Sequence, residues 1–325
     1  MKLYMLYQLA GYYRFCMRDT DMPYRKLLVL VLLLVSASVS FAAERENPDI
    51  RVVLDNGDVY LGQLSDGVRH GQGVYTWQDG RKYHGHFELG KRAGEGTLEW
   101  PNGNTYRGQF LDNQMNGRGS FTWANDDRYE GDFVHGRRTG KGTYSWNSGD
   151  VYEGDFVGGQ LQGDGIFSWS DGRIYRGGFL AGLKSGKGIY NWPNSNKYDG
   201  EFNKDERHGN GVYYWRDGTV YHGHFAHNRS HGYGVKHKPD GLSEFQHWED
   251  GRLLTSVSIF ANPKCMLEIG GIEWMFKNDS CINGLAHGTA SAVSLDGSRI
   301  LVDAEIILGN LVSGEIEFLA QASSN

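Results

Sequence analysis

The sequence predicts an all-β protein assembled from one repeated hairpin, and three observations carry that prediction. Tyrosines recur at a spacing of 23 residues through the middle of the chain. Within each unit the aromatic and glycine positions alternate with the period of two at which strand side chains share a face. Glycine makes up 47 of the 325 residues but proline only 6, so turns are abundant, while a collagen-like or disordered chain is excluded.

The repeated unit reads Tyr-x-Gly-x-Phe, six residues, Gly-x-Gly, three residues and Trp. Its tyrosines are Tyr60, Tyr83, Tyr106, Tyr129, Tyr152, Tyr175, Tyr198 and Tyr221. The tryptophans that end the units are Trp77, Trp100, Trp123, Trp146, Trp169, Trp192 and Trp215, and Lys238 takes this place in the last unit. Units of this kind are expected to stack, because one hairpin alone cannot bury its rings.

The two faces of each strand differ in chemistry. Tyr83, Gly85 and Phe87 share one face, and Trp100 lies on the same kind of face in the second strand of its unit. Glycine has no Cβ, so we expect a ring from a neighbouring strand to lie flat over the main chain there. The other face carries carboxylates such as Glu130 and small polar residues, which is typical of a solvated surface.

A turn is expected after each tryptophan, where a glycine such as Gly80 can adopt the left-handed conformation. Asp126 and Ser195 replace that glycine in two units. Aspartate tolerates this conformation. For Ser195 we expect the flanking asparagines, Asn194 and Asn196, to shift the turn by one residue.

The repeated motif closely resembles the MORN repeat (membrane occupation and recognition nexus). The resemblance covers about residues 58–241 as eight full units. It implies an elongated single-layer twisted antiparallel sheet of stacked β-hairpins. Sixteen strands spaced roughly 4.8 Å apart would extend over about 75 Å.

The N-terminal segment is interpreted as a secretory signal peptide. Residues 27–35 form an unbroken apolar run that follows Arg25 and Lys26, and small residues lead to a cleavage site after Ala42. Translation is expected to begin at Met22, which starts an n-region of ordinary length. An uncleaved anchor is the alternative, although the run is short for a bilayer span. We therefore expect an exported protein, periplasmic or secreted.

The regular pattern ends near residue 251. The ninth tyrosine position holds Glu244 instead, and Trp248 keeps an aromatic ring where the phenylalanine belongs. Residues 300–304 and 305–308 are interpreted as strands of a diverged β extension. The predicted organisation is a signal peptide (1–42), a lead-in (43–57), an array of eight units plus a degenerate half unit (58–251), and a diverged β C-terminal extension (252–325).

Cys265 and Cys281 both lie in the C-terminal extension. An exported protein meets an oxidising compartment, so a disulfide between them is the prediction, and two buried free thiols are the alternative. A bridge closing a loop of about 15 residues contributes about 3 kcal/mol.

The sequence gives no sign of catalysis. It has no phosphate-binding loop with lysine and no Gly-x-Ser-x-Gly elbow, so we expect no enzyme and no cofactor. Histidines such as His84 and His86 occupy variable polar positions, so no metal site is expected. Residues 1–42 carry a net charge of +3, so the chain without them carries −9 in place of −6, which opposes binding to nucleic acid or to anionic lipid.

We therefore expect a non-catalytic scaffold that binds a protein or a cell-envelope polymer through its aromatic and glycine face. Peripheral lipid binding is the alternative, which the family resemblance implies, and an enzyme using residues 252–325 is a third hypothesis. Packing between repeats is the simpler role for the rings, but a single layer leaves some of them exposed. The candidate residues are Tyr83, Trp100, Tyr106, Trp123, Tyr129, Tyr144, Trp146, Tyr152, Trp169, Tyr175, Tyr190, Trp192, Tyr198, Tyr213 and Trp215.

Overall fold

The computed structural model describes residues 49–259, 265, 267–276, 281–283, 285–295 and 298–319. The chain divides into two units, Met1–Pro48 and Asp49–Asn325. The predicted signal peptide therefore lies outside the described residues. Across the described ranges, no helical segment has the length and apolar character that a bilayer crossing requires.

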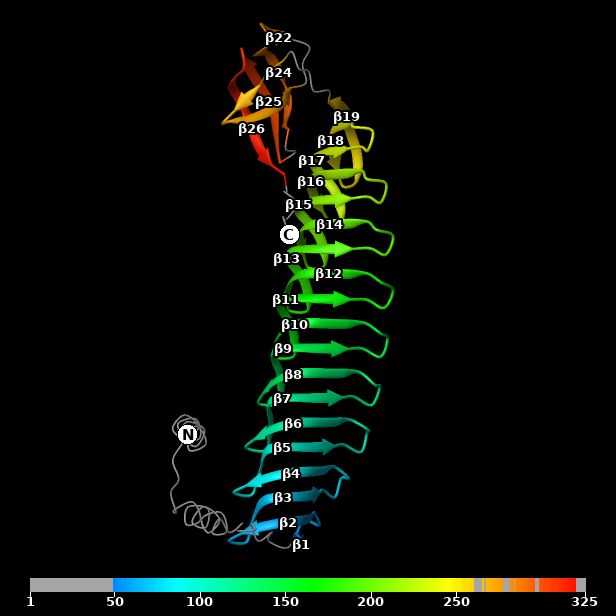
Figure 1. Ribbon diagram of the computed structural model, residues 1–325, viewed down its shortest axis with the longest axis vertical. Coiled ribbons are helices and arrows are strands. Elements are labelled where there is room, and N and C mark those ends of the chain that lie inside the picture. The colour runs from blue at the N-terminus through cyan, green and yellow to red at the C-terminus, as the bar shows by residue number, and fades with distance from the viewer. Residues whose placement is uncertain are drawn as a thin grey trace, which may run out of the picture. The chain divides into compact units, whose positions relative to one another are not determined.

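The larger of two main sheets is an antiparallel meander of 19 strands, in which each strand pairs with the next one along the chain (Figure 1). Its strands are β1 (Ile50–Val53), β2 (Val59–Ser65), β3 (Val68–Thr76), β4 (Lys82–Glu88), β5 (Lys91–Glu99), β6 (Thr105–Leu111), β7 (Gln114–Thr122), β8 (Arg128–Val134), β9 (Arg137–Ser145), β10 (Val151–Val157), β11 (Gln160–Ser168), β12 (Ile174–Leu180), β13 (Leu183–Asn191), β14 (Lys197–Asn203), β15 (Glu206–Tyr214), β16 (Val220–Ala226), β17 (Arg229–His237), β18 (Ser243–Glu249) and β19 (Arg252–Ile259). The fold class is the predicted one, and β1, β18 and β19 extend the sheet beyond the sixteen strands that the repeats supply.

Two kinds of connection alternate along this sheet. Tight turns such as Leu89-Gly90, with φ of +49° and +80°, have the double left-handed geometry that suits the twist of a hairpin. The wider loops follow the tryptophans, where the Gly80 amide donates to the Trp77 carbonyl at 3.0 Å. The Ser195 amide makes the same bond to Trp192, also at 3.0 Å, and Ser195 has φ of +69°. The expected shift of that turn is therefore wrong, because serine itself takes the left-handed conformation.

A β-bulge interrupts each hairpin of the array. Gly85 pairs with Gly96, but the next paired position joins Phe87 to Arg92, so the second strand has extra residues at this point. One of them, Gly94, has φ of +59°. A bulge of this kind bends the strand and increases its twist. Each hairpin is therefore bent at the same place, between its tight turn and the two glycines that pair across its strands, such as Gly85 and Gly96.

Adjacent repeats are joined at both ends of their strands. At the tight turns, the Gly136 amide donates to the Met115 carbonyl of the previous repeat at 2.9 Å. At the wide loops, Asp127 Oδ1 accepts a bond of 2.9 Å from the Asn147 amide of the next repeat. Such bonds recur along the array, so each repeat is held chiefly by its two neighbours, as in other repeat proteins.

The C-terminal residues form a separate smaller sheet, coloured orange to red in Figure 1. Its order is β20 (Glu268–Ile269), β21 (Ile272–Phe276), β24 (Gly288–Ser294), β25 (Arg299–Ile307) and β26 (Asn310–Phe318), and β22 (Cys281–Ile282) pairs with β23 (Leu285–Ala286). The interpretation of residues 300–304 and 305–308 as two strands is wrong. They lie in the single strand β25, whose register is irregular between Val302 and Glu305.

Cys265 is buried and disulfide-bonded. The side chain of Cys281 lies outside the described residues, so the pairing of these two cysteines stays a prediction. An apolar cluster packs the smaller sheet against the last strands of the array. In it Val235 of β17 and Phe245 of β18 meet Ile300 and Val302 of β25. His224 Nε2 also lies 3.6 Å from Glu317 Oε2 of β26. The C-terminal sheet therefore covers the polar face at the last repeats.

Candidate partner-binding face

The repeat tyrosines form the core of the array. The eight tyrosines that recur every 23 residues, from Tyr60 to Tyr221, are each at most 1% exposed. The ring of Tyr129 lies over two paired glycines, Gly131 of its own strand and Gly142 of the next strand. A Cβ added at Gly142 would come within 2.5 Å of the Tyr129 Cε2 atom. The Tyr129 hydroxyl donates to the Asp132 carbonyl at 3.1 Å. The sequence pattern of bare backbone beneath each ring is thus confirmed, since only glycine leaves room for the tyrosine.

The phenylalanines link these tyrosines into a continuous row. Tyr129 packs edge-on against Phe133 of its own repeat, with ring centroids 5.2 Å apart, and against Phe156 of the next repeat at 5.0 Å. The same contacts run from Tyr60 to Trp248, so Trp248 does replace the ninth phenylalanine. We call this row the inner ladder: Tyr60, Tyr83, Tyr106, Tyr129, Tyr152, Tyr175, Tyr198 and Tyr221, with Phe87, Phe110, Phe133, Phe156, Phe179, Phe202 and Phe225.

A second row of rings lies beside the wide loops. Trp123 contacts Tyr144 of the next repeat at 5.2 Å between centroids, and Trp146 in turn stacks on Phe167 at 5.1 Å. We call this row the outer ladder: Trp100, Phe121, Trp123, Tyr144, Trp146, Phe167, Trp169, Tyr190, Trp192, Tyr213 and Trp215. Most of its members are half-buried, and Trp215 is 36% exposed. The outer ladder therefore keeps ring surface in contact with solvent.

The predicted binding residues separate into two groups by their accessibility. Tyr83, Tyr106, Tyr129, Tyr152, Tyr175 and Tyr198 have no exposed surface, and Tyr190 has 8%. A partner cannot touch the first six in this folded state, so their role is packing. The accessible candidates are Trp100, Trp123, Tyr144, Trp146, Trp169, Trp192, Tyr213 and Trp215, all of the outer ladder.

Burial raises the tyrosine pKa to about 12 at both Tyr129 and Tyr144, but the hydrogen-bond partners of the two ladders differ. With its pKa raised, the Tyr129 hydroxyl stays a neutral donor at ordinary pH. In the outer ladder, Tyr144 donates to Asp127 Oδ2 at 3.0 Å. The pKa of the Asp127 carboxyl is lowered, chiefly by the bond from the Asn147 amide and with help from Tyr144. The charged carboxylate of Asp127 in the wide loop thus holds the outer-ladder ring of Tyr144 in place.

A column of cations lies between the two ladders, which the sequence reasoning missed. The guanidinium of Arg138 is 5.0 Å from the Tyr144 centroid and 5.5 Å from that of Trp123, and it donates to the Gly159 carbonyl at 2.9 Å. Equivalent positions carry Arg69, Arg92, Lys184 and Arg207, but Met115, Leu161 and Ser230 in the other repeats. The sequence signal that could have identified this column is a basic residue five positions after the phenylalanine position of the unit.

Charge pairing differs within this column. Lys184 Nζ lies 2.9 Å from Asp205 Oδ1. Within the described part of the chain, no carboxylate lies within ion-pair distance of Arg69, Arg92, Arg138 or Arg207. A guanidinium has five N–H donors and remains charged at neutral pH. The aromatic face therefore presents four guanidinium cations that have no carboxylate partner among the described residues.

A hollow on this face lies at the N-terminal end of the array. It encloses about 300 Å³ and is lined by Arg69, Tyr75, Trp77, Phe87, Arg92 and Asn113. The Arg69 guanidinium lies 4.7 Å from the centroid of Tyr75, and that of Arg92 lies 5.3 Å from Trp77. Two cations from adjacent repeats thus share one aromatic-walled pocket.

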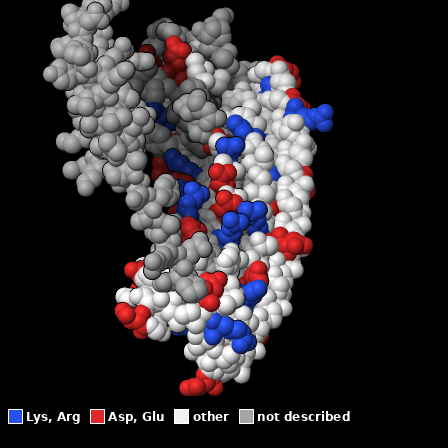
Figure 2. Space-filling view, turned by 60° about the horizontal axis from the view of Figure 1, so that its bottom comes forward, with Lys and Arg blue, Asp and Glu red and all other residues white. Residues whose placement is uncertain are grey.

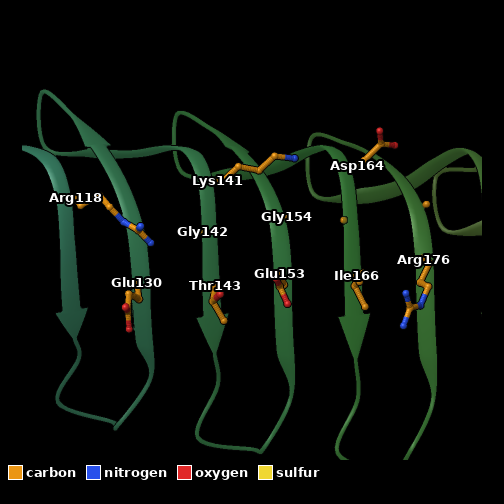
Figure 3. A pocket seen from close by; sticks show the side chains of 12 residues that line it. Arg118, Glu130, Lys141, Gly142, Thr143, Glu153, Gly154, Asp164, Ile166 and Arg176 are labelled. Carbon is orange, nitrogen blue, oxygen red and sulfur yellow. The ribbon is translucent and has the colours of Figure 1, made fainter.

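The polar face has a wider and more open depression of about 730 Å³ over β7 to β12 (Figure 3). Arg118, Glu130, Lys141, Glu153 and Asp164 line it, so it carries charges of both signs. Figure 2 shows Lys and Arg side chains beside Asp and Glu side chains along a hollow of the array. One of the cations of the depression is paired at its edge, where Lys141 Nζ lies 2.8 Å from Asp155 Oδ1. Among the described residues, His, Cys, Asp and Glu form no group of three that could hold a metal ion.

Comparison with known proteins identifies the repeat. The family model described as MORN repeat matches residues 60–80, 83–105, 106–128, 129–151, 152–172, 175–197, 198–220 and 221–243. No curated protein matches the chain.

Among solved structures, the chain resembles the TCP domain of Drosophila melanogaster SAS-4 in complex with a proline-rich motif of Ana2. That match has 18% identity, covers 48% of this chain and 85% of the other, and has a TM-score of 0.31. The TCP10 domain of Danio rerio CPAP in complex with a STIL peptide has 12% identity, covers 64% and 98%, and has a TM-score of 0.37. Likeness at these scores supports no conclusion about function.

Proposed function

Because the chain belongs to the MORN repeat family, we propose that it is a non-catalytic scaffold that binds a protein partner across several repeats. The observation that carries this proposal is the outer ladder, whose ring contacts run unbroken from Trp100 to Trp215. Partly exposed rings repeated at a regular spacing offer the same small contact many times. Linked contacts of this kind bind through a high effective concentration.

The test uses a photoreactive phenylalanine analogue at single positions of the full chain, followed by identification of crosslinked partners from the native source. Placed at Trp146, on the outer ladder, it should capture a protein partner. The matched control is Thr143, which lies three residues earlier, on β9, and lines the polar depression. Crosslinks from Thr143 and none from Trp146 would move the function to the polar face.

An envelope polymer in place of a protein, and peripheral lipid binding, are the alternative ligands. Partly exposed tryptophans suit sugars and head groups as well as peptides, and the arginines without a carboxylate partner favour an anionic ligand. The charge of −9 on the chain without residues 1–42 opposes approach to an anionic bilayer. Flotation with neutral and anionic vesicles separates lipid binding from the other two.

Export is part of the proposal and rests on residues 27–42 alone. N-terminal sequencing of the natural protein should begin at Ala43 or Glu44. A protein that retains residues 22–42 within a membrane fraction would contradict cleavage and favour the anchor.

A further inference from the structure

We propose that the aromatic face binds an acidic, proline-rich segment in the polyproline II conformation, with one turn of the segment per repeat. This inference rests on the proposed function and names its partner class. Three features support it: the axial spacing of the repeats, the accessible rings, and the unpaired arginines between the ladders.

The spacing of the repeats selects the conformation of the ligand. Each repeat adds two strands, so equivalent positions lie about 9.6 Å apart along the array. A polyproline II helix has three residues per turn and advances about 9.3 Å per turn. Every third residue of such a segment therefore meets the same chemistry in successive repeats, and the mismatch is only a few tenths of an ångström.

Other extended or helical segments fit this spacing less well. A β-strand presents alternate residues to one face at intervals of about 6.6 Å, which drifts out of register with the repeats at once. Two turns of an α-helix advance about 10.8 Å, so the misfit accumulates to several ångströms over four repeats. Polyproline II segments are also the ligands that aromatic-lined grooves commonly take, since little conformational entropy remains to be lost.

The arginines select the charge of the ligand. Arg69, Arg92, Arg138 and Arg207 lie beside ring walls without a carboxylate partner among the described residues. The donated bond of each guanidinium to a turn carbonyl, as from Arg92 to Asn113, holds its position and leaves other N–H groups to bind a ligand. Arg–carboxylate pairs are stronger and more directional than neutral hydrogen bonds. Carboxylates spaced three residues apart would meet adjacent repeats of this column.

The pocket of about 300 Å³ between Arg69 and Arg92 is the expected anchor. It is the place where two unpaired arginines occupy adjacent repeats. Farther along, Met115 and Leu161 interrupt the column and Lys184 is neutralised by Asp205. The strongest contact of the segment is therefore expected here, over the partly exposed Trp77 and beside the two guanidinium groups.

Synthetic peptides of about 15 residues test the inference with the full chain. A repeating Pro-Pro-Glu peptide should bind at least about tenfold more tightly than Gly-Gly-Glu, which has the same charge but no preformed helix, and than Pro-Pro-Lys, which has the opposite charge. Calorimetry or tryptophan fluorescence measures the affinities. Equal affinities for the proline and glycine peptides would overturn the conformational part of the proposal.

Arginine variants locate the site. Replacing both arginines (Arg69→Met and Arg92→Met) keeps apolar packing but removes the charges, and should weaken Pro-Pro-Glu binding by about tenfold or more. The control is Arg107→Met, an exposed arginine on the polar face of β6, which should change the affinity by less than about twofold. If the double variant has a lowered melting temperature, Arg92→Lys serves instead. This variant should lose affinity because the ammonium lacks the planar fork of a guanidinium, but less than the double variant because it keeps the positive charge.

The remaining outcomes separate the two proposals. If Gly-Gly-Glu binds as well as Pro-Pro-Glu and the arginine variants weaken both, the protein-binding function stands and the polyproline II inference fails. If anionic vesicles bind more tightly than any peptide and the same variants abolish that binding, the ligand is a lipid surface and both fail. If Pro-Pro-Glu binding survives the double variant, the anchor is wrongly placed.

Discussion

The inner and outer ladders repeat with the same period and lie on the same face, yet their rings differ in burial and in role. Tyr129 lies over two glycines, is inaccessible to solvent and donates to its own strand. Trp146 lies next to a wide loop and remains partly exposed. The difference comes from the backbone beneath the rings, because the glycine pair lets a ring sink to the level of the main chain. Regular recurrence of an aromatic residue therefore does not by itself indicate a binding surface.

The largest effect should follow from filling the space beneath an inner ring. Gly142→Val should destabilise the protein by several kcal/mol, because its side chain would displace the ring of Tyr129 from only 2.5 Å away. Thr143→Val, the next residue but on the polar face, should be nearly neutral. Thermal unfolding measures both, and equal melting temperatures would contradict the assignment of faces.

Removing a ring should distinguish the ladders directly. Tyr129→Ala should cost about 3–5 kcal/mol, as for other large aromatic residues removed from a core. Trp146→Ala should cost roughly 1–2 kcal/mol, because less of its surface is buried. Denaturant unfolding of the two variants gives the comparison. A larger loss at Trp146 would mean that the outer ladder carries the fold.

Deleting a repeat should affect binding more than deleting one accessible ring. Removal of residues 129–151 takes out one complete unit and keeps the register of the rest, and it should weaken partner binding by about tenfold or more. Tyr144→Ala should weaken it by about twofold. Affinity for a crosslinked partner or for the Pro-Pro-Glu peptide measures this. Binding that survives loss of any unit but depends on residues 252–325 would show that the array is only a spacer.

The smallest expected effect is an acid sensitivity at the wide loop whose Asp127 carboxylate accepts a hydrogen bond from Tyr144. The pKa of Asp127 is lowered, chiefly by the Asn147 amide, so the carboxylate stabilises the fold above its unfolded pKa of 3.8, and this contribution is lost as the pH falls through the folded pKa. The Asp127→Asn variant keeps a hydrogen-bond acceptor oxygen at this position, but its amide group does not ionise. The stability difference between the two proteins should therefore shrink between pH 6 and pH 3. A constant difference would contradict a role for the charge.

The strands, the faces and the glycine–ring packing could be predicted because period-two alternation and a strict repeat depend only on local sequence. Two features could not. The left-handed turn at Ser195 follows from the geometry that neighbouring repeats impose on the loop, which overrides the preference of serine. The burial of Tyr83 and its equivalents depends on the depth that the glycine pair allows, and alternation identifies the face of a ring but not its depth.

The candidate site was predicted only in part for a related reason. The tryptophans were identified from their recurrence, but the arginines were not, because Met115, Leu161 and Ser230 break their column. Their importance lies in what surrounds them, since Arg138 lies among four rings of three consecutive repeats. Contacts of that kind exist only after the hairpins stack.

A meander that never closes on itself has two terminal strands, and each offers backbone donors and acceptors to another chain. Here the first of them, β1, spans only Ile50–Val53, whereas the strands within the repeats are seven or nine residues long. A second molecule adding at this end could form only a short ladder of hydrogen bonds. Short edge strands are one means by which β proteins resist edge-to-edge polymerisation. The brevity of β1 thus favours an array of fixed length over a growing fibre.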